Sequence, residues 1–299
     1  MITPKFLQKG DTVAIVSTAR KISAEEIYDA ISLLISWELK VVVGTTIGLK
    51  ENQFAGTDEQ RSYDFQTMLD DTNIKAIWCA RGGYGTVRII DNLDFSNFIK
   101  NPKWIIGYSD VTVLHSHLHN LGVKTLHATM PINVPKNTKN SLNSLKNSLF
   151  GQKKTKKCNF STKNKIEKSN GILVGGNLSM FYSLLGSTSS IDTRNKILFL
   201  EDLDEYLYHI DRMLMNLKRN GYFDQLAGLI VGGMTGMHDN SIPFGKNVEE
   251  IILDIVSEYD FPVCFGFPAG HIDDNTALIL GSEVELDVNE NGTVLIYKN

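Results

Sequence analysis

Ser109 lies in a Gly-Tyr-Ser-Asp pattern at residues 107–110, which is typical of an exposed serine nucleophile. An apolar run ends here, a glycine precedes the serine by two positions, and a helical stretch follows. A sharp strand-to-helix turn of this kind exposes the serine hydroxyl, and the N–H of Asp110 can help to hold an oxyanion. The second glycine of the usual hydrolase pattern is replaced by Val111. The plainer alternative, in which Ser109 and Asp110 only cap the helix, therefore stays open.

A second pattern, Arg-Gly-Gly-Tyr-Gly at residues 81–85, follows another apolar run. Three glycines in four positions allow the backbone to approach a ligand closely. The spacing differs from GxGxxG and no Walker lysine follows, but a phosphate loop is still one interpretation. The other is that Gly83 donates its N–H to the same oxyanion as Asp110, because the two strand ends would be neighbours in a doubly wound sheet.

Glu201 and His271 also follow apolar runs. Glu201 comes at a strand end, whereas the other acidic residues of 201–205 are explained by the dipole of the next helix. His271 ends the segment Gly-Phe-Pro-Ala-Gly-His at 266–271, and a histidine held on such a loop is a candidate base, although loop histidines are often incidental. The order Ser, Glu, His is also the order that hydrolases with a nucleophile elbow use.

Two other hydrolase types fit these residues less well. A metallohydrolase could use His115, His117 and His119, of which the first and last share a helix face. No glutamate follows the first histidine as it does in HExxH, and no further ligand is evident. A glutamine-amidotransferase-like enzyme would need a cysteine where Ser109 stands.

The elements that must carry these residues alternate between strands and helices. Apolar runs predict strands at 12–17, 40–43, 75–79, 103–107 and 123–127. A helix capped by Ser23 is expected to bury one face, which consists of Ile27, Ile31, Leu34 and Ile35. Thr57 opens a second helix, and 87–90 is also expected to be helical. This alternation predicts a parallel, doubly wound sheet whose sites lie at the carboxyl ends of its strands.

The second half of the chain predicts a separate domain. Apolar runs lie at 197–200, 228–232 and 262–266, and three last strands at 277–280, 283–287 and 293–297 are expected to form an antiparallel meander. An amphipathic helix between them has one apolar face, formed by Leu207, Ile210, Leu214 and Leu217. We therefore expect a first domain at 1–135, a connecting segment at 136–170 that is rich in Lys, Asn and Ser, and a second domain at 171–299.

Composition excludes several classes of function. The 299 residues have a net charge of −4, and the lysine-rich stretch at 134–170 has few aromatic residues, so a solvated connection is preferred to a nucleic-acid patch. No run approaches the roughly 20 apolar residues of a membrane helix, and the N-terminus has no signal-peptide core. Three widely spaced cysteines argue for a reducing compartment. We expect a cytoplasmic protein without nucleic-acid or membrane partners.

Five longer segments occur in an order that resembles the LD-carboxypeptidase family of serine peptidases, which also contains the microcin C immunity peptidases. These segments are ARGGYGTVRIID, IIGYSDVTVLH, GGNLS, LFLEDLDEYLYHIDRML and GFPAGHIDDN. The resemblance implies that Ser109 is the nucleophile, His271 the base and Glu201 the residue that orients the base. It also implies an N-terminal Rossmann-like domain, a smaller C-terminal β-rich α/β domain, a homodimer, and no metal or cofactor.

The resemblance further implies a substrate. The family substrate is the murein tetrapeptide of cell-wall recycling, which is cut between the L-centre of its diamino acid and its terminal D-alanine. An exopeptidase must recognise a free carboxylate, and we expect Arg81 to do so. A peptidyl-nucleotide antibiotic of the microcin C type is the alternative substrate, and a non-catalytic two-domain binding protein is the alternative of another class. The segment after Leu126 departs from many members, because His127 is followed by Ala-Thr-Met-Pro rather than by Gly-Pro.

Overall fold

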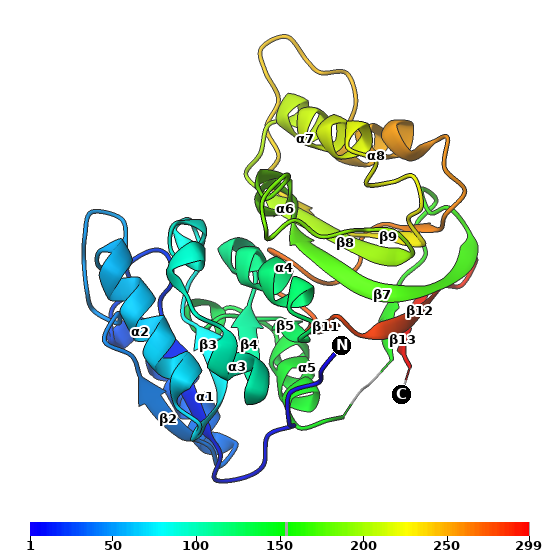
Figure 1. Cartoon of the computed structure of the whole chain (residues 1–299). Helices are drawn as coiled ribbons and strands as arrows, with labels where there is room; N and C mark the ends of the chain where they lie inside the picture. Colours follow the sequence, from blue (N-terminus) through cyan, green and yellow to red (C-terminus); the bar gives the residue numbers. More distant parts are fainter. Residues whose placement is uncertain (153–154, 299) are drawn as a thin grey trace.

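Two β-sheets, one based mainly on each half of the chain, organise the computed structural model (Figure 1). The structure describes residues 1–152 and 155–298. Residues 153–154, which belong to the predicted connecting segment, and residue 299 lie outside the described residues. Each sheet carries its own helices, so the α/β class with two domains that the sequence predicts is confirmed.

The first sheet is parallel apart from one edge strand. Its order is β11 (Leu278–Leu280), β5 (Thr125–His127), β4 (Trp104–Gly107), β3 (Ile74–Cys79), β1 (Thr12–Val16) and β2 (Lys40–Val43). The order 2-1-3-4-5 is that of a doubly wound sheet, with its switch point between β1 and β3. The expected antiparallel meander is confirmed for its last two strands, which pair with each other. It is wrong for the strand at 277–280, because β11 pairs antiparallel with β5 and not with the strand that follows it.

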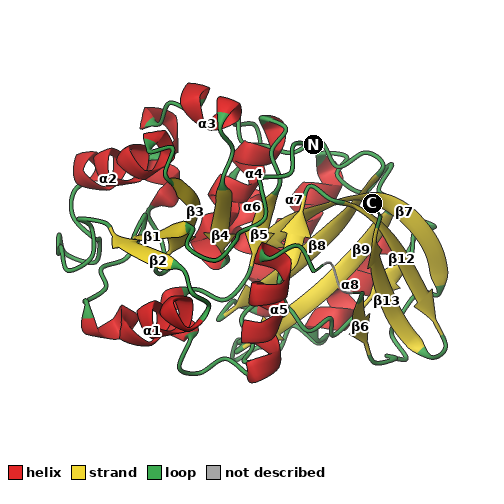
Figure 2. Ribbon diagram, turned by 90° about the horizontal axis from the view of Figure 1, so that it is seen from below, coloured by secondary structure: helices red, strands yellow, loops and turns green. Residues whose placement is uncertain are grey.

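Helices cover both faces of this sheet (Figure 2). One face packs against α2 (Asp58–Asp70), α3 (Ser96–Lys100) and α4 (Thr112–Asn120). The other packs against α1 (Tyr28–Ser36) and α5 (Lys139–Leu149). Short 3₁₀ turns lie at Glu25–Ile27, Thr86–Arg88, Ile90–Asn92, Ser109–Val111 and Pro131–Asn133. The helix expected at 87–90 is therefore formed as two 3₁₀ turns.

Helix α1 buries the expected face apart from one residue, and Ile31 packs against the same core. Ile27 and Leu34 are buried as predicted, but Ile35 is 60% exposed and Ala30 is buried in its stead. Helix geometry explains the difference, because at about 100° per residue Ala30 lies only about 40° from Leu34 around the axis, whereas Ile35 lies about 100° from it. Helix α2 begins as expected, with a capping box between Thr57 and Gln60.

The predicted connecting segment is largely folded. Leu145 and Leu149 of α5 are buried in the core of the first sheet, with Leu142 packed beside them. The i, i+3, i+7 spacing of these leucines explains the helix, whose Lys, Asn and Ser residues occupy the remaining positions. After residue 155 the segment forms β6 (Lys156–Cys158) and the start of β7 (Glu167–Asn177).

The second sheet is half parallel and half antiparallel. Its order is β10 (Val263–Cys264), β9 (Gly228–Thr235), β8 (Lys196–Leu203), β7, β12 (Glu283–Asn289), β13 (Gly292–Tyr297) and β6, of which the first four strands are parallel. One face packs against α6 (Leu178–Ser183), α7 (Leu207–Arg219) and α8 (Val248–Val256). The predicted apolar face of α7 is confirmed by Ile210, Leu214 and Leu217, which are all fully buried.

The two halves are joined where α4 meets the end of β7. Thr112 Oγ1 accepts a hydrogen bond from the Asn177 N–H at 3.0 Å. A Cβ at Gly176 would lie only 2.5 Å from the same oxygen, so a glycine is needed for this approach. In Figure 1, α4 of the first domain lies next to α6 of the second. The contact brings the carboxyl ends of β4 and β7 to a common region.

Two further features concern the helices and the cysteines. None of the helices within the described ranges combines the length and apolar character that a bilayer crossing requires. Cys79, Cys158 and Cys264 are all unpaired, and two of them are buried.

Arg61 of α2 is a buried charge that ties the loops of the first sheet together. Its Nη1 donates to the carbonyl oxygens of Thr18 at 2.6 Å and Gly85 at 2.9 Å, and its Nη2 pairs with Asp58. Thr18 follows β1, and Gly85 ends the glycine-rich turn after β3. No sequence pattern indicated this role.

We expect Arg61→Met to lower the free energy of unfolding by about 3–5 kcal/mol, because it leaves two buried carbonyls without their donor and removes one of the two arginines that pair with Asp58. Urea denaturation would measure the loss. Arg88→Met is the matched control, since Arg88 pairs with the same Asp58 but is exposed, and it should cost less than about 1 kcal/mol. Equal stability of the two variants would contradict this role.

Candidate active site

Ser109 lies at the sharp turn between β4 and α4, as the elbow pattern predicts. Tyr108 is extended, whereas Ser109 has φ of +63°, in the left-handed region. That conformation costs a non-glycine residue roughly 1–2 kcal/mol, and such residues cluster at functional sites. The 3₁₀ turn that begins at Ser109 leads directly into α4. The serine side chain is thus held in a strained turn at the carboxyl end of a buried strand.

The glycine-rich turn packs against this elbow. A Cβ at Gly82 would lie 2.9 Å from Ser109 Cβ and 3.0 Å from its Oγ, so only glycine fits there. The same position is 3.4 Å from the Asp110 nitrogen, whose N–H belongs to the first helical turn and lacks an intrahelical acceptor. Gly83 follows with φ of +107°. The roles of Asp110 and Gly83 in an oxyanion hole stay predictions; Asp110 directly follows Ser109, and Gly83 directly follows the Gly82 that contacts it.

The Asp110 side chain binds the backbone at the end of the glycine-rich turn. Its Oδ2 accepts the Thr86 N–H at 2.9 Å, and the carboxyl group is fully buried. Burial raises the pKa of Asp110, which the hydrogen bonds from Thr86 and the charge of Arg61 partly oppose. Because this carboxyl group already occupies the N–H after the turn, the arrangement argues against a phosphate loop.

Glu201 and His271 are in direct contact. The Glu201 carboxylate is completely buried at the end of β8, and its Oε2 lies 2.6 Å from His271 Nδ1. The same oxygen accepts the backbone N–H of His271 at 3.0 Å. A carboxylate facing Nδ1 fixes the proton on that nitrogen and leaves Nε2 as the basic atom. This arrangement is that of an oriented general base.

The loop that carries His271 is anchored at several points. Gly270 has φ of +106°, and a Cβ there would lie 2.7 Å from Glu201 Oε2, so a side chain would separate the pair. The Gly270 N–H donates to Asn275 Oδ1 at 2.9 Å. The Gly233 N–H donates to the Ala269 carbonyl, also at 2.9 Å, and so links the loop to β9. The position of His271 is therefore set by the backbone.

The surroundings of His271 raise its pKa above the ordinary value. Burial lowers the pKa, but the charge and hydrogen bond of Glu201, together with the charge of Asp202, raise it by more. The neighbouring Asp202 is itself buried, and burial with the charge of Glu201 raises its pKa to about 6. The site is thus rich in negative charge on the side of the second sheet.

Asp202 is a polar residue that the sequence analysis missed. Its Oδ1 accepts the side-chain amide of Asn177 at 2.8 Å, and its Oδ2 accepts the Ser179 N–H at 2.9 Å. Asn177 in turn caps α6 through the Met180 N–H. Asp202 therefore ties the end of β8 to the end of β7. Its place at a strand end was the available signal, which the helix-dipole interpretation of 201–205 obscured.

Tyr108 joins the two parts of the site. Its ring lies 4.7 Å from the His271 ring, centroid to centroid, at an edge-on angle of 63°. His271 therefore packs against the residue that precedes Ser109. Within the described residues, no hydrogen bond joins the Ser109 hydroxyl to His271. Such bonds are often long before substrate binds, so the missing bond does not count against His271 as the base of Ser109.

Arg81 lies away from this cluster. Its Nη1 donates to the Lys21 carbonyl at 3.4 Å and lies 3.8 Å from Glu26 Oε1. The guanidinium is thus engaged by the loop after β1. Of the residues predicted from sequence, the structure gathers Ser109, Asp110, Gly83, Glu201 and His271 in one region, but it does not bring the Arg81 guanidinium to the elbow.

The three histidines of α4 have separate environments. His115 Nε2 donates to the Gly107 carbonyl at 2.9 Å, whereas His117 Nδ1 contacts Ser189 Oγ at 3.0 Å. His119 has a buried Nδ1 without a partner. Among residues 1–152 and 155–298, no three His, Cys, Asp or Glu side chains are arranged to hold a metal ion.

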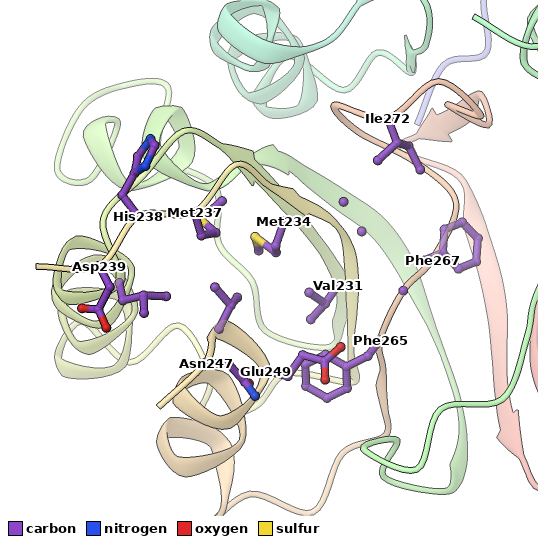
Figure 3. Close-up of a pocket in the computed structure, with 15 residues that line it drawn as sticks. Val231, Met234, Met237, His238, Asp239, Asn247, Glu249, Phe265, Phe267 and Ile272 are labelled. Atoms are coloured by element: carbon purple, nitrogen blue, oxygen red, sulfur yellow. The ribbon is translucent and has the colours of Figure 1, made fainter. Parts of the chain in front are cut away.

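A cavity of about 660 Å³ lies beside the loop of the candidate base (Figure 3). Its wall is mainly apolar and includes Met234, Met237, Phe265, Phe267 and Ile272. Ile272 directly follows His271, and Asn247 and Glu249 mark the opposite side at the start of α8. The cavity thus adjoins the base, while Ser109, Glu201 and His271 themselves do not line it.

Family profiles match most of the chain. The LD-carboxypeptidase N-terminal domain matches residues 13–128, and the LD-carboxypeptidase C-terminal domain matches residues 170–286. A probable murein peptide carboxypeptidase of Bacillus subtilis is 35% identical over 98% of this chain and 93% of that protein. The microcin C7 self-immunity protein MccF of Escherichia coli is 25% identical over 94% of this chain and 92% of that protein.

A solved structure supports the same relationship. The muramoyltetrapeptide carboxypeptidase from Oxalobacter formigenes superimposes with a TM-score of 0.87 at 25% identity. The match covers 96% of this chain and 99% of that one, so both domains and their arrangement are shared.

We expect Glu201→Gln to lower the maximal kcat/KM by roughly 10³–10⁴-fold. We also expect the acid limb of the pH profile of kcat/KM to move to lower pH. His271 must be neutral to act as a base, and its raised pKa holds that limb above the ordinary histidine value. The amide removes the charge that raises the pKa while burial persists. The pH profile of kcat/KM would measure both effects.

Glu205→Gln is the matched control, since Glu205 pairs with His209 on the adjacent helix. It should change kcat/KM by less than about 3-fold. An acid limb that stays in place in Glu201→Gln, or a larger loss in the control, would contradict the assignment.

Proposed function

We propose that this chain, which belongs to the LD-carboxypeptidase family, uses Ser109, His271 and Glu201 to release the terminal D-alanine of the murein tetrapeptide. Family membership makes it a serine-type carboxypeptidase. The substrate and the residues that act on it are the proposed part. One observation carries this proposal: the Glu201–His271 pair packs against Tyr108, the residue next to the strained Ser109.

The proposed mechanism is acyl transfer through the serine. His271 Nε2 takes the Ser109 proton as the hydroxyl oxygen attacks the scissile carbonyl, and Glu201 stabilises the imidazolium that forms. The N–H groups of Asp110 and Gly83 would stabilise the tetrahedral oxyanion, each by about 3 kcal/mol. The imidazolium then protonates the amine of D-alanine, which leaves an ester on Ser109. Water, deprotonated by the same base, hydrolyses the ester.

Murein peptide is the substrate that the comparisons favour. The Bacillus subtilis relative at 35% identity is named as a probable murein peptide carboxypeptidase, and it is more similar than the MccF relative at 25%. The MccF likeness keeps a peptidyl-nucleotide antibiotic as the alternative. Product analysis on purified tetrapeptide beside a peptidyl-adenylate analogue separates the two.

Other expectations from the family resemblance stay predictions. Unpaired Cys79, Cys158 and Cys264 support a reducing, cytoplasmic location. The exposed Tyr206, Tyr208 and Ile242 are apolar side chains that a homodimer would cover. Sedimentation velocity and cell fractionation would test these two expectations.

Ser109→Ala should abolish D-alanine release from the tetrapeptide, because no acyl-enzyme can form without the hydroxyl. Removing the hydroxyl from a half-buried site should leave the fold and the thermal midpoint unchanged within a few degrees. Amino-acid analysis of the products and circular dichroism would measure the two properties. Ser183→Ala, which changes an exposed serine of α6, should retain full turnover. Turnover by Ser109→Ala above about 1% of the unaltered rate would remove this mechanism.

A further inference from the structure

Arg20 lies on the loop that follows β1, next to the switch point of the first sheet. In open α/β sheets, ligands bind in the crevice outside the carboxyl ends of the strands at that point. The glycine-rich turn lies on the other side of the point, after β3. Arg20 is exposed, and its side chain lies against the glycine-rich turn.

The Arg20 side chain lies across Gly83. A Cβ at Gly83 would be 2.1 Å from Arg20 Cδ and 3.5 Å from its Nε, and the φ of +107° also requires glycine. The preceding Gly82 contacts Ser109, and consecutive α-carbons are about 3.8 Å apart. Chain geometry therefore limits the separation of Arg20 Nε and Ser109 Oγ to about 13 Å. An arginine side chain with several rotatable bonds can shorten that distance readily.

The other cations around the glycine-rich turn are already engaged. Arg61 is buried and bonded to two carbonyls, and Arg88 pairs with Asp58. Arg81 donates to the Lys21 carbonyl, and the Lys21 ammonium donates to the Asn52 carbonyl. Across the described ranges, the Arg20 guanidinium has neither a hydrogen bond nor an ion pair. It is the available cation beside the elbow.

The opposite wall of the site is acidic. Glu201 and Asp202 lie near the end of β8, and the negative charge of Asp273 acts on Tyr108 from the loop of the base. A second carboxylate would be repelled there. In a substrate cut next to its last residue, the terminal carboxylate lies only about 4 Å from the scissile carbon. That carboxylate is therefore directed toward the side of the first sheet, where Arg20 lies.

From this juxtaposition we infer that Arg20 binds the free α-carboxylate of the terminal residue and so makes the enzyme an exopeptidase. The guanidinium presents two parallel N–H groups, which match a carboxylate better than an ammonium does. Arg20 thus takes the role that the sequence analysis expected of Arg81. The inference rests on the proposed function, because it concerns the leaving residue of the same reaction.

The test compares the tetrapeptide with its C-terminal carboxamide. The unaltered enzyme should prefer the free acid by about 100-fold or more in kcat/KM. Arg20→Gln should lose roughly 100-fold on the acid, mainly through KM, and change less than about 3-fold on the carboxamide. Arg20→Lys should be intermediate, because it keeps the charge but not the paired N–H groups.

Two matched variants complete the design. Lys21→Gln, the adjacent cation, should leave the preference for the acid unchanged. If Arg81→Gln removes the preference and Arg20→Gln keeps it, Arg20 is not the carboxylate ligand. Equal losses on both substrates in Arg20→Gln would mean that Arg20 only supports the loop, which also overturns the inference.

The outcome for the unaltered enzyme separates this inference from the proposed function. D-Alanine release together with an undiminished preference in Arg20→Gln would overturn the role of Arg20 alone. Absence of release by the unaltered enzyme would overturn both.

Discussion

The contact between the buried carboxylate of Glu201 and the imidazole of His271 is the interaction on which the rest of the site depends. A fully buried carboxylate is costly unless it is paired and hydrogen-bonded, and His271 supplies both its ring N–H and its backbone N–H. Gly270 makes the approach possible because any side chain there would enter the carboxylate. The hydrogen bond from the Gly233 N–H to the Ala269 carbonyl links the loop of His271 to β9. The hydrogen bonds of Asp202 link the end of β8 to the end of β7.

The two halves of the chain are locked together close to that contact. Helix α4, which begins just after the elbow, is bonded to the end of β7 through Thr112 and Asn177. Strand β11 comes late in the sequence but pairs with β5 of the first sheet. The chain therefore crosses from the second sheet to the first and then returns to the second for β12 and β13. Tyr108 consequently lies against His271, although the serine comes from one half of the chain and the imidazole from the other. A hinge motion between the two domains would have to break these contacts. We therefore expect side chains, rather than whole domains, to move when substrate binds.

Much of this arrangement could be predicted from sequence, because strand ends are marked by apolar runs. Ser109, Glu201 and His271 each follow such a run, and within the second sheet parallel strands bring the carboxyl ends that carry Glu201 and His271 to one edge. The approach of the first sheet, which carries Ser109, depends on the contact between Thr112 and Asn177 and could not be predicted. The pairing of β11 with β5 could not be predicted, since a three-residue strand carries no signal for its partner. The directions of the Arg20 and Arg81 side chains could not be predicted either. They depend on the positive φ of Gly83 and on the position of the Lys21 carbonyl. Asp202 and Arg61 are buried charges whose partners come from distant segments.

The most direct measurement of the central claim is the mapping of a fluorophosphonate adduct by mass spectrometry. If His271, oriented by Glu201, activates Ser109, one adduct should form, on Ser109, and its rate of formation should fall by at least about 100-fold in His271→Ala. An adduct on another residue, or labelling of Ser109 at an unchanged rate in that variant, would contradict the account.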